Sequence, residues 1–218
     1  MSNEDWRDSW RRNDIEFHQT DGNGLLRRFW ADLDLPAGAP ILVPLCGKSR
    51  DLVWLAAQGH PVLGVELSPI AITALFRESG LTPTRRKEGR FMAWRHGNLT
   101  ILCGDFFDLN PAHVAGIAVV YDRSSLTALP EATRRDYAAH MIRILPKASR
   151  TLLLTTESPE GDVAPPPYRI DEEVTTLYGT AWNIELLHGE TVPEEDPDLP
   201  DGPLLQMEAK VYLLAPKP

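Results

Sequence analysis

Short apolar runs alternate with amphipathic segments along the first 156 residues of the chain. The runs predict buried strands, and the segments between them, where apolar side chains recur every three or four residues, predict helices. The expected strands are 41–45, 62–66, 91–95, 99–102, 117–121 and 150–156, and the expected helices are 3–17, 23–33, 50–58, 69–79 and 130–145. A helix at 171–178 and two strands, 182–187 and 205–214, complete the pattern.

This alternation favours an α/β fold. Helical connections join parallel strands and cover both faces of their sheet, whereas the two consecutive C-terminal strands are expected to form an antiparallel edge pair. A chain of 218 residues suits one domain with a sizeable core. We therefore expect a single domain, 1–218, in which residues 1–33 form an N-terminal helical lid and residues 34–218 form the sheet core.

The bulk composition is that of an ordinary globular protein. No apolar run approaches the ~20 residues of a membrane-spanning helix, and the charged segment Met1–Arg12 lacks the apolar centre of a signal peptide. Two cysteines, Cys46 and Cys103, do not indicate a disulfide framework. These features predict a cytoplasmic protein that has no membrane partner.

The net charge of −9 is unevenly distributed along the chain. Residues 157–218 hold 14 acidic and 3 basic residues, so the preceding part is slightly positive. The acidic end argues against a nucleic-acid partner. Its simplest interpretation is solvated loops, and the proline-rich segments Pro165–Pro167 and Pro193–Pro203 are expected to be two of them.

The strongest indication of chemistry comes from the first two strands of the main pattern. The run Ile41–Leu45 leads through a tight turn at Gly47 into a helix, and the run Pro61–Val65 ends on Glu66. In open α/β sheets, ligands bind beyond the carboxyl ends of the strands, where an acid at the end of the second strand grips a ribose. A nucleotide-like cofactor is therefore expected there, although Glu66 would also serve as an ordinary acid at a strand end.

The glycines of this turn narrow the choice of cofactor. The fingerprint G-x-G-x-x-G of dinucleotide sites is absent, and Gly47 is the only glycine in the first strand–helix turn. A pyrophosphate is therefore disfavoured, which shifts the expectation from NAD to S-adenosylmethionine, a molecule with a ribose and an adenine but no diphosphate. No phosphate-binding P-loop, serine-hydrolase elbow or metal-ligand spacing occurs, so no metal is expected.

Two further strand ends carry candidate binding residues. Asp105 follows one strand, where its carboxylate can accept from an adenine amino group while a ring such as Phe106 covers the base. Phe106 and Phe107 are equally consistent with the core. Arg123 ends the next strand at the same edge, where it serves either a ligand or a surface ion pair.

The N-terminal segment is an expected helix with aromatic residues among charged ones. Trp6 and Trp10 are four residues apart, and Phe17 follows at the end of the segment. These aromatic side chains fit two alternatives: the docking face of an amphipathic helix, or a lid that closes over a ligand and excludes water.

Together, these segments resemble the thiopurine S-methyltransferase family, in its bacterial form, from about residue 4 to residue 214. The matching pieces are Trp6 and Trp10 with Phe17-His18, Val43–Ser49, Gly59-His60 with Gly64–Ser68, Phe107–Leu109, Tyr121–Arg123, Pro165–Pro167 and Lys210–Leu214. The segment P-L-C-G-K-S is specific to the family, whereas the acid after the second strand is common to methyltransferases.

The resemblance implies a class I methyltransferase fold with a seven-stranded sheet and S-adenosyl-L-methionine as the methyl donor. It places donor contacts on Trp10, Leu45, Gly47, Glu66, Asp105, Phe106 and Arg123, with Asp105 and Phe106 at the adenine pocket. It also places Phe17 and Arg123 at the acceptor, and Arg123 as the catalytic residue. Residues 193–203 contain no Arg or Lys, whereas mammalian members carry an arginine near the acceptor in the corresponding loop.

The expected reaction is methyl transfer to the sulfur of thiopurines or similar aromatic thiols, with selenium or tellurium compounds as further candidate acceptors. The resemblance implies a monomer whose partners are small molecules. Two alternatives stay open on the sequence alone: an NAD-dependent oxidoreductase on a similar sheet, and a nucleoside-binding module without catalysis.

Overall fold

The computed structural model describes residues 2–15, 19, 21–157, 170, 173–194 and 204–217. The chain divides into two compact units, Met1–Tyr121 and Asp122–Pro218, and the division falls within one strand. The expectation of a single domain stays a prediction. The predicted sites and loops at Phe17, at Pro165–Pro167 and at residues 195–203 lie outside the described residues.

The sheet of the first unit is parallel in its centre. Its strands are β1 (Ile41–Val43), β2 (Val62–Glu66), β3 (Thr84–Glu88), β4 (Phe91–His96), β5 (Leu99–Cys103) and β6 (Val119–Arg123), in the order β3-β4-β5-β2-β1-β6. Strand β1 pairs in parallel with β2 and β6, and β2 pairs in parallel with β5. The carboxyl ends of these strands consequently meet at one edge.

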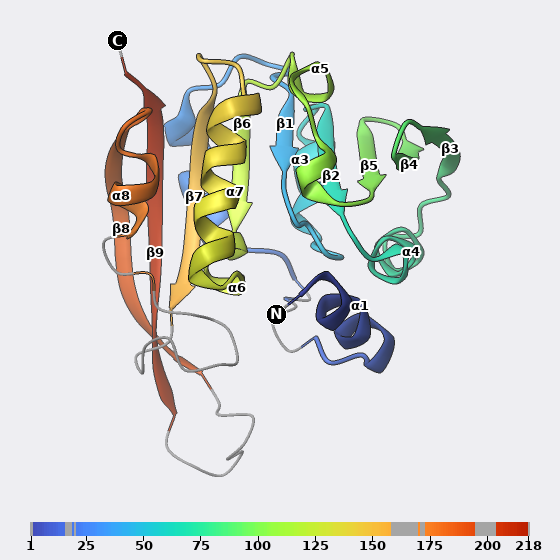
Figure 1. The fold of residues 1–218 in the computed structure, drawn as a ribbon, viewed down its shortest axis with the longest axis horizontal. Coiled ribbons are helices and arrows are strands. Elements are labelled where there is room, and N and C mark those ends of the chain that lie inside the picture. The colour runs from blue at the N-terminus through green and yellow to red at the C-terminus, as the bar shows by residue number, and fades with distance from the viewer. Residues whose placement is uncertain are drawn as a thin grey trace. The chain divides into compact units, whose positions relative to one another are not determined.

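The first unit also contains α-helices and short 3-10 helices. They are α1 (Asn3–Arg12), α2 (Gly24–Phe29), η1 (Ala31–Leu33), α3 (Asp51–Ala57), α4 (Pro69–Glu78), η2 (Phe106–Asp108) and α5 (Pro111–Val114). The arrowheads of β1 and β5 point toward the side on which α1 lies, next to α4 (Figure 1). Ser68 caps α4 by accepting from Ala71 N, as its sequence S-P predicts.

The second unit contains the antiparallel strands of the chain's end. Its elements are α6 (Ser125–Ala128), α7 (Glu131–Ile144), β7 (Arg150–Glu157), α8 (Glu173–Tyr178), β8 (Trp182–Glu194) and β9 (Leu205–Pro216). Strand β9 pairs antiparallel with both β7 and β8, which confirms the expected edge pair. The predicted α/β fold is confirmed.

Three expectations need correction. The first helix ends at Arg12 instead of residue 17, because Asn13 adopts a left-handed conformation (φ 59°) and caps it. The described residues form nine strands instead of seven, since the hairpin β3–β4 extends the sheet beyond β5. Strand β8 continues to Glu194, into the segment expected to be a loop, because its pairing with β9 extends that far.

Apolar side chains fill the interior as the sequence pattern predicts. On α7, Tyr137, Ala138, Met141 and Ile144 are all buried on one face.

Within the part of the chain that the structure describes, no helix has both the length and the apolar character that crossing a membrane requires.

Candidate active site at the strand ends

The turn after β1 has an unusual backbone. Leu45 has a positive φ of 44°, and Gly47 has one of 54°. A left-handed conformation suits glycine but strains a bulky side chain, and such strained residues concentrate at functional sites. No pattern in the sequence predicts this conformation at Leu45. The turn is held to the neighbouring strand by a hydrogen bond from Cys46 N to Val65 O.

Glu66 ends β2 and binds this turn directly. One carboxylate oxygen accepts from Gly47 N at 2.8 Å, and the other accepts from Ser68 N at 2.6 Å. Only 6% of the Glu66 residue surface is exposed, and burial raises the pKa of its carboxyl while these backbone N–H groups lower it. Each carboxylate oxygen has two acceptor sites, so Glu66 keeps capacity to accept from ribose hydroxyls.

The two cysteines lie near Glu66, and both are expected to be poor nucleophiles. Cys46 lies within the turn after β1, and Cys103 pairs with Glu66 across β5 and β2. Burial, followed by the charge of Glu66, raises the pKa of both thiols. A thiol whose pKa is raised holds little thiolate and is a poor nucleophile.

The segment after β5 presents the predicted adenine-pocket residues. The Asp105 carboxylate accepts from Phe107 N at 2.9 Å and thereby caps η2. Phe106 is buried, whereas Phe107 is 42% exposed, and their rings meet edge to face at 5.7 Å between centroids. Since Cys103 pairs with Glu66, Asp105 and Glu66 follow adjacent strand ends.

Helix α1 reaches these strand ends at two points. Asn3, at its start, donates from Nδ2 to Asp105 Oδ2 at 2.7 Å. Trp10, near its end, is buried against the turn after β1, where a methyl group added at Gly47 would lie 3.3 Å from Trp10 Cζ2. Helix α1 therefore extends from the turn after β5 to the turn after β1, which is the position expected of a lid.

Asp51 is a buried acid that the sequence pattern did not single out, and it joins the segment before α2 to strand β6. Asp51, in the first turn of α3, accepts from Asn23 N at 2.7 Å and from the Tyr121 hydroxyl at 2.9 Å. Its residue surface is only 2% exposed. An acid three residues after Lys48, directly before an apolar helix, reads as an ordinary helix start, so only the fold reveals these partners.

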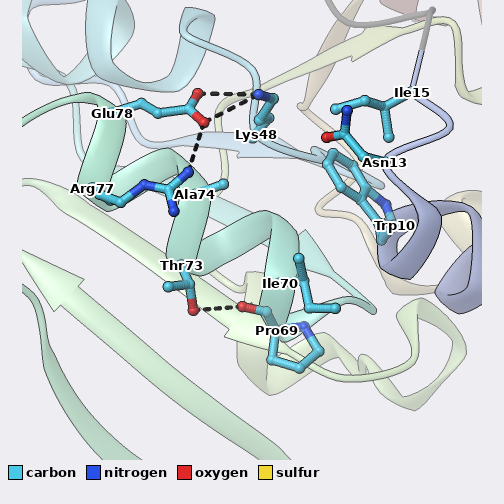
Figure 2. Close-up of a pocket in the computed structure, with 10 residues that line it drawn as sticks. All are labelled: Trp10, Asn13, Ile15, Lys48, Pro69, Ile70, Thr73, Ala74, Arg77 and Glu78. Carbon is cyan, nitrogen blue, oxygen red and sulfur yellow. Dashed lines mark hydrogen bonds and ion pairs between the residues drawn. The ribbon is translucent and has the colours of Figure 1, made fainter.

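A cavity of about 350 Å³ lies beside Trp10, on the side of α4. Figure 2 shows the Trp10 indole on one side and Thr73, Ala74 and Arg77 of α4 on the other. Lys48 and Glu78 close one end with an ion pair at 3.1 Å. Trp10 is the only predicted site residue among the described residues that line this cavity, so Trp10 forms a wall between the Gly47 turn and the cavity.

Arg123 ends β6, as expected, and belongs to the second unit. The next residue, Ser124, has a positive φ of 60°, so the backbone turns sharply after the arginine. The preceding residue, Asp122, is buried and accepts from the Tyr137 hydroxyl at 2.7 Å. Burial raises the pKa of Asp122, and burial together with Asp122 raises the pKa of Tyr137.

The structure gathers most of the predicted donor contacts in the first unit. Those described there, at or beside the ends of β1, β2 and β5, are Trp10, Leu45, Gly47, Glu66, Asp105 and Phe106. They include two carboxylates, those of Glu66 and Asp105, and the buried ring of Phe106. This set suits a nucleoside whose remainder carries no diphosphate.

Comparison with known sequences identifies the family. Residues 1–217 match the family model described as "Thiopurine S-methyltransferase (TPMT)". The thiopurine S-methyltransferase of Stutzerimonas stutzeri (strain A1501) is 46% identical over 216 residues, which cover 99% of this chain and 91% of that protein. The one of Nitrosospira multiformis (strain ATCC 25196 / NCIMB 11849 / C 71) is 42% identical and covers 98% of each.

Solved structures agree on the fold. A SAM-dependent methyltransferase from Anabaena variabilis ATCC 29413 matches with a TM-score of 0.66 and 15% identity, over 99% of this chain and 95% of that one. The Burkholderia thailandensis 1,6-didemethyltoxoflavin-N1-methyltransferase, solved with S-adenosylhomocysteine, matches with a TM-score of 0.65 and 15% identity, over 99% and 87%. The class I methyltransferase-like fold is thereby confirmed, and the family match favours a methyltransferase over an NAD-dependent oxidoreductase.

Proposed function

Because the chain belongs to the thiopurine S-methyltransferase family, we propose that it transfers a methyl group from S-adenosyl-L-methionine to the sulfur of a thiopurine or similar aromatic thiol. That the chain is an S-adenosylmethionine-dependent methyltransferase follows from the family itself. The acceptor is the proposed part. The names of the family and of the relatives support it.

The position of Glu66 is the main observation that supports the proposed donor site. It is a buried acid at the end of β2, fixed by Gly47 N and Ser68 N, and its two oxygens have more acceptor sites than these bonds use. Hydroxyl groups at the 2′ and 3′ positions of a ribose would use that capacity. Since the carboxylate is already held in place, little orientational freedom is lost when the ribose binds.

The other residues follow the same assignment. We propose Trp10, Leu45, Gly47, Asp105, Phe106 and Arg123 as further donor contacts, and Phe17 with Arg123 at the acceptor. Support comes from the family resemblance and, within the first unit, from the grouping of the described residues at the strand ends. Phe17 lies outside the described residues.

The chain's residues have a limited chemical task in this reaction. When bound, S-adenosylmethionine supplies a methyl group already activated by a sulfonium. The protein must align a soft nucleophile about 3–3.5 Å from that carbon and exclude water, a role for which α1 is suitably placed. Thiopurine thiols are acidic enough to be largely anionic near neutral pH, so no strong base is required. The guanidinium of Arg123 would stabilise that anion by charge and hydrogen bonding.

Selenium and tellurium compounds are proposed as further acceptors, since their anions are also soft nucleophiles that need alignment more than a base. The same donor site would serve them. The acidic segment 193–203 has no Arg or Lys, so its residues offer no additional cation to an anionic acceptor.

Calorimetric titration separates the donor from the alternatives. We expect the protein to bind S-adenosylmethionine and S-adenosylhomocysteine and to show no affinity for NAD. Binding of NAD in preference to S-adenosylhomocysteine would contradict the proposal. A parallel activity screen with thiopurines, aromatic thiols, selenite and tellurite would then rank the acceptors.

A further inference from the structure

Asp105 is held as a fixed hydrogen-bond acceptor next to the proposed ribose site. Its Oδ1 accepts from Phe107 N at 2.9 Å, in the turn that follows β5. Strand β5 pairs with β2 so that Cys103 lies opposite Glu66, which puts Asp105 just past the neighbouring strand end. A nucleoside whose ribose binds Glu66 would therefore extend its base toward Asp105.

The second oxygen of Asp105 is held from a distant part of the chain. Asn3 Nδ2 donates to Asp105 Oδ2 at 2.7 Å across 102 residues of sequence. Together, the two bonds fix both oxygens, so the carboxylate cannot rotate without breaking one of them. Each oxygen still has one acceptor site left.

Asn3 is itself well positioned by its helix. It is the first residue of α1 and lies inside a capping box, in which Ser2 Oγ accepts from Asp5 N and Asp5 Oδ2 accepts from Ser2 N at 2.6 Å. The other end of α1 is held by Trp10 against Gly47. The amide of Asn3 consequently reaches Asp105 from a helix anchored at both ends.

A carboxylate with both oxygens fixed discriminates between bases by their 6-substituent. A 6-amino group donates to the remaining acceptor site on Oδ2, whereas a 6-oxo group presents only an acceptor and leaves two acceptors facing each other. We infer that Asn3 is a positioning residue that orients Asp105 to accept from the 6-amino group of the donor's adenine. This assignment rests on the proposed function and adds the determinant of base selectivity to it.

Two ligands that differ only at the 6-position of the base test the role of Asn3. Calorimetry would compare S-adenosylhomocysteine with its 6-oxo analogue, S-inosylhomocysteine, on the full-length protein and on Asn3→Ala. We expect the wild type to prefer the 6-amino ligand. Asn3→Ala should lose about fivefold in affinity for that ligand alone, the effect of one net hydrogen bond.

Two further variants complete the test. Glu4→Gln is the matched control, because Glu4 is the next residue of α1 and pairs with Arg7 and Arg11 of the same helix. It should match the wild type with both ligands. Asp105→Asn presents an amide in place of the second acceptor oxygen. It should abolish the preference for the 6-amino ligand.

The outcomes separate this inference from the proposed function. Equal affinity of wild type and Asn3→Ala for S-adenosylhomocysteine, or tighter binding by the variant, would overturn the positioning role. Equal losses for both ligands would also overturn it, since Asn3 would then act only by holding α1. Failure of the wild type to bind either ligand would overturn the proposed donor itself.

Discussion

Glu66 has two functions in this account, one in the turn after β1 and one in the donor site. It binds the backbone N–H groups of Gly47 and Ser68, and in the proposed donor site it would also accept from a ribose. We expect Glu66→Ala to weaken the binding of S-adenosylhomocysteine by about 1.5–3 kcal/mol, since a charged hydrogen-bond partner is lost. Calorimetric titration of the folded variant measures the change.

A second acid of the same unit provides the control for Glu66. Glu78 pairs with Lys48 at the cavity beside α4, away from the end of β2, so Glu78→Gln should bind the ligand as the wild type does. Thermal unfolding of each variant shows that it is folded. Unchanged ligand affinity in folded Glu66→Ala would refute the ribose assignment.

Asp122 allows a test based on pH. Burial raises its pKa above the unfolded value of about 3.9, so between these two pKa values the native state keeps a proton that the unfolded state has lost. The free energy of unfolding therefore falls as pH rises through this window. Asp122→Asn retains an acceptor for the Tyr137 hydroxyl but lacks the titration.

Urea unfolding between pH 4 and pH 7 measures this effect. We expect the stability of the wild type, relative to Asp122→Asn, to decrease from pH 4 upward until the native carboxyl has ionised. Asp136→Asn, which changes an exposed acid on α7, is the control for general charge effects. A relative stability that is constant, or that increases with pH, would show that Asp122 is not held neutral by burial.

Among the elements, α1 is the N-terminal helix that contacts the proposed donor site at both of its ends. It contacts Asp105 through Asn3 and Gly47 through Trp10. We expect the amides of α1 to exchange more slowly when S-adenosylhomocysteine is bound, because the ligand adds contacts beneath the helix. Hydrogen exchange with and without the ligand measures this, and equal protection in both states would favour a docking helix over a lid.

Two glycines with the same φ of 54° provide a matched pair of variants for α1. Alanine at Gly47 would meet Trp10 at 3.3 Å, whereas alanine at Gly97 would meet nothing within 4 Å. Both changes carry a left-handed strain of about 1–2 kcal/mol. Only Gly47→Ala should also speed hydrogen exchange in α1, and equal exchange in the two variants would show that Trp10 does not depend on this turn.

The elements show which features could be predicted from sequence. Strand β2, with its run of apolar residues ending on Glu66, has the boundaries that the pattern predicts. Strand β3 does not follow such a pattern, because its residues Thr84–Lys87 are exposed and polar. It pairs with β4, and Arg85 stacks on Trp94 of that strand at 3.7 Å. These contacts join the two strands of a hairpin, so periodicity along β3 alone does not reveal them.

The candidate site divides in the same way. Glu66 and Asp105 could be predicted because strand ends in α/β sheets are known ligand positions. The left-handed Leu45, the bond between Asn3 and Asp105, and the partners of Asp51 could not. Each depends on segments that are far apart in sequence and meet only in the folded chain.

At the scale of the whole molecule, the proposed catalytic role of Arg123 predicts the effect of replacing it. Replacement by alanine should cost about 2.7–4 kcal/mol in turnover at saturating donor, as for loss of a fixed charge at the reacting atom. Arg123→Lys keeps the charge but loses the planar fork, so it should be partly active. Turnover assays with a thiopurine measure both, and Arg135→Ala, at an exposed arginine of α7, is the control.

Wild-type turnover together with wild-type donor affinity in the Arg123→Ala variant would mean that this arginine is structural. The donor affinity of the same variant, measured by titration, separates the two roles: a loss of affinity with unchanged turnover at saturation indicates donor binding alone. A loss of turnover that exceeds the loss of affinity supports the catalytic assignment.

Direct detection of the transferred methyl group tests the central claim, which is methyl transfer to the sulfur of an aromatic thiol. The purified protein is incubated with S-adenosylmethionine carrying a labelled methyl group and with 6-mercaptopurine, and both products are followed by mass spectrometry. We predict labelled S-methyl-mercaptopurine and S-adenosylhomocysteine in equal amounts. Tight binding of S-adenosylhomocysteine without any methylated thiol, from this acceptor or from other aromatic thiols, would contradict the account.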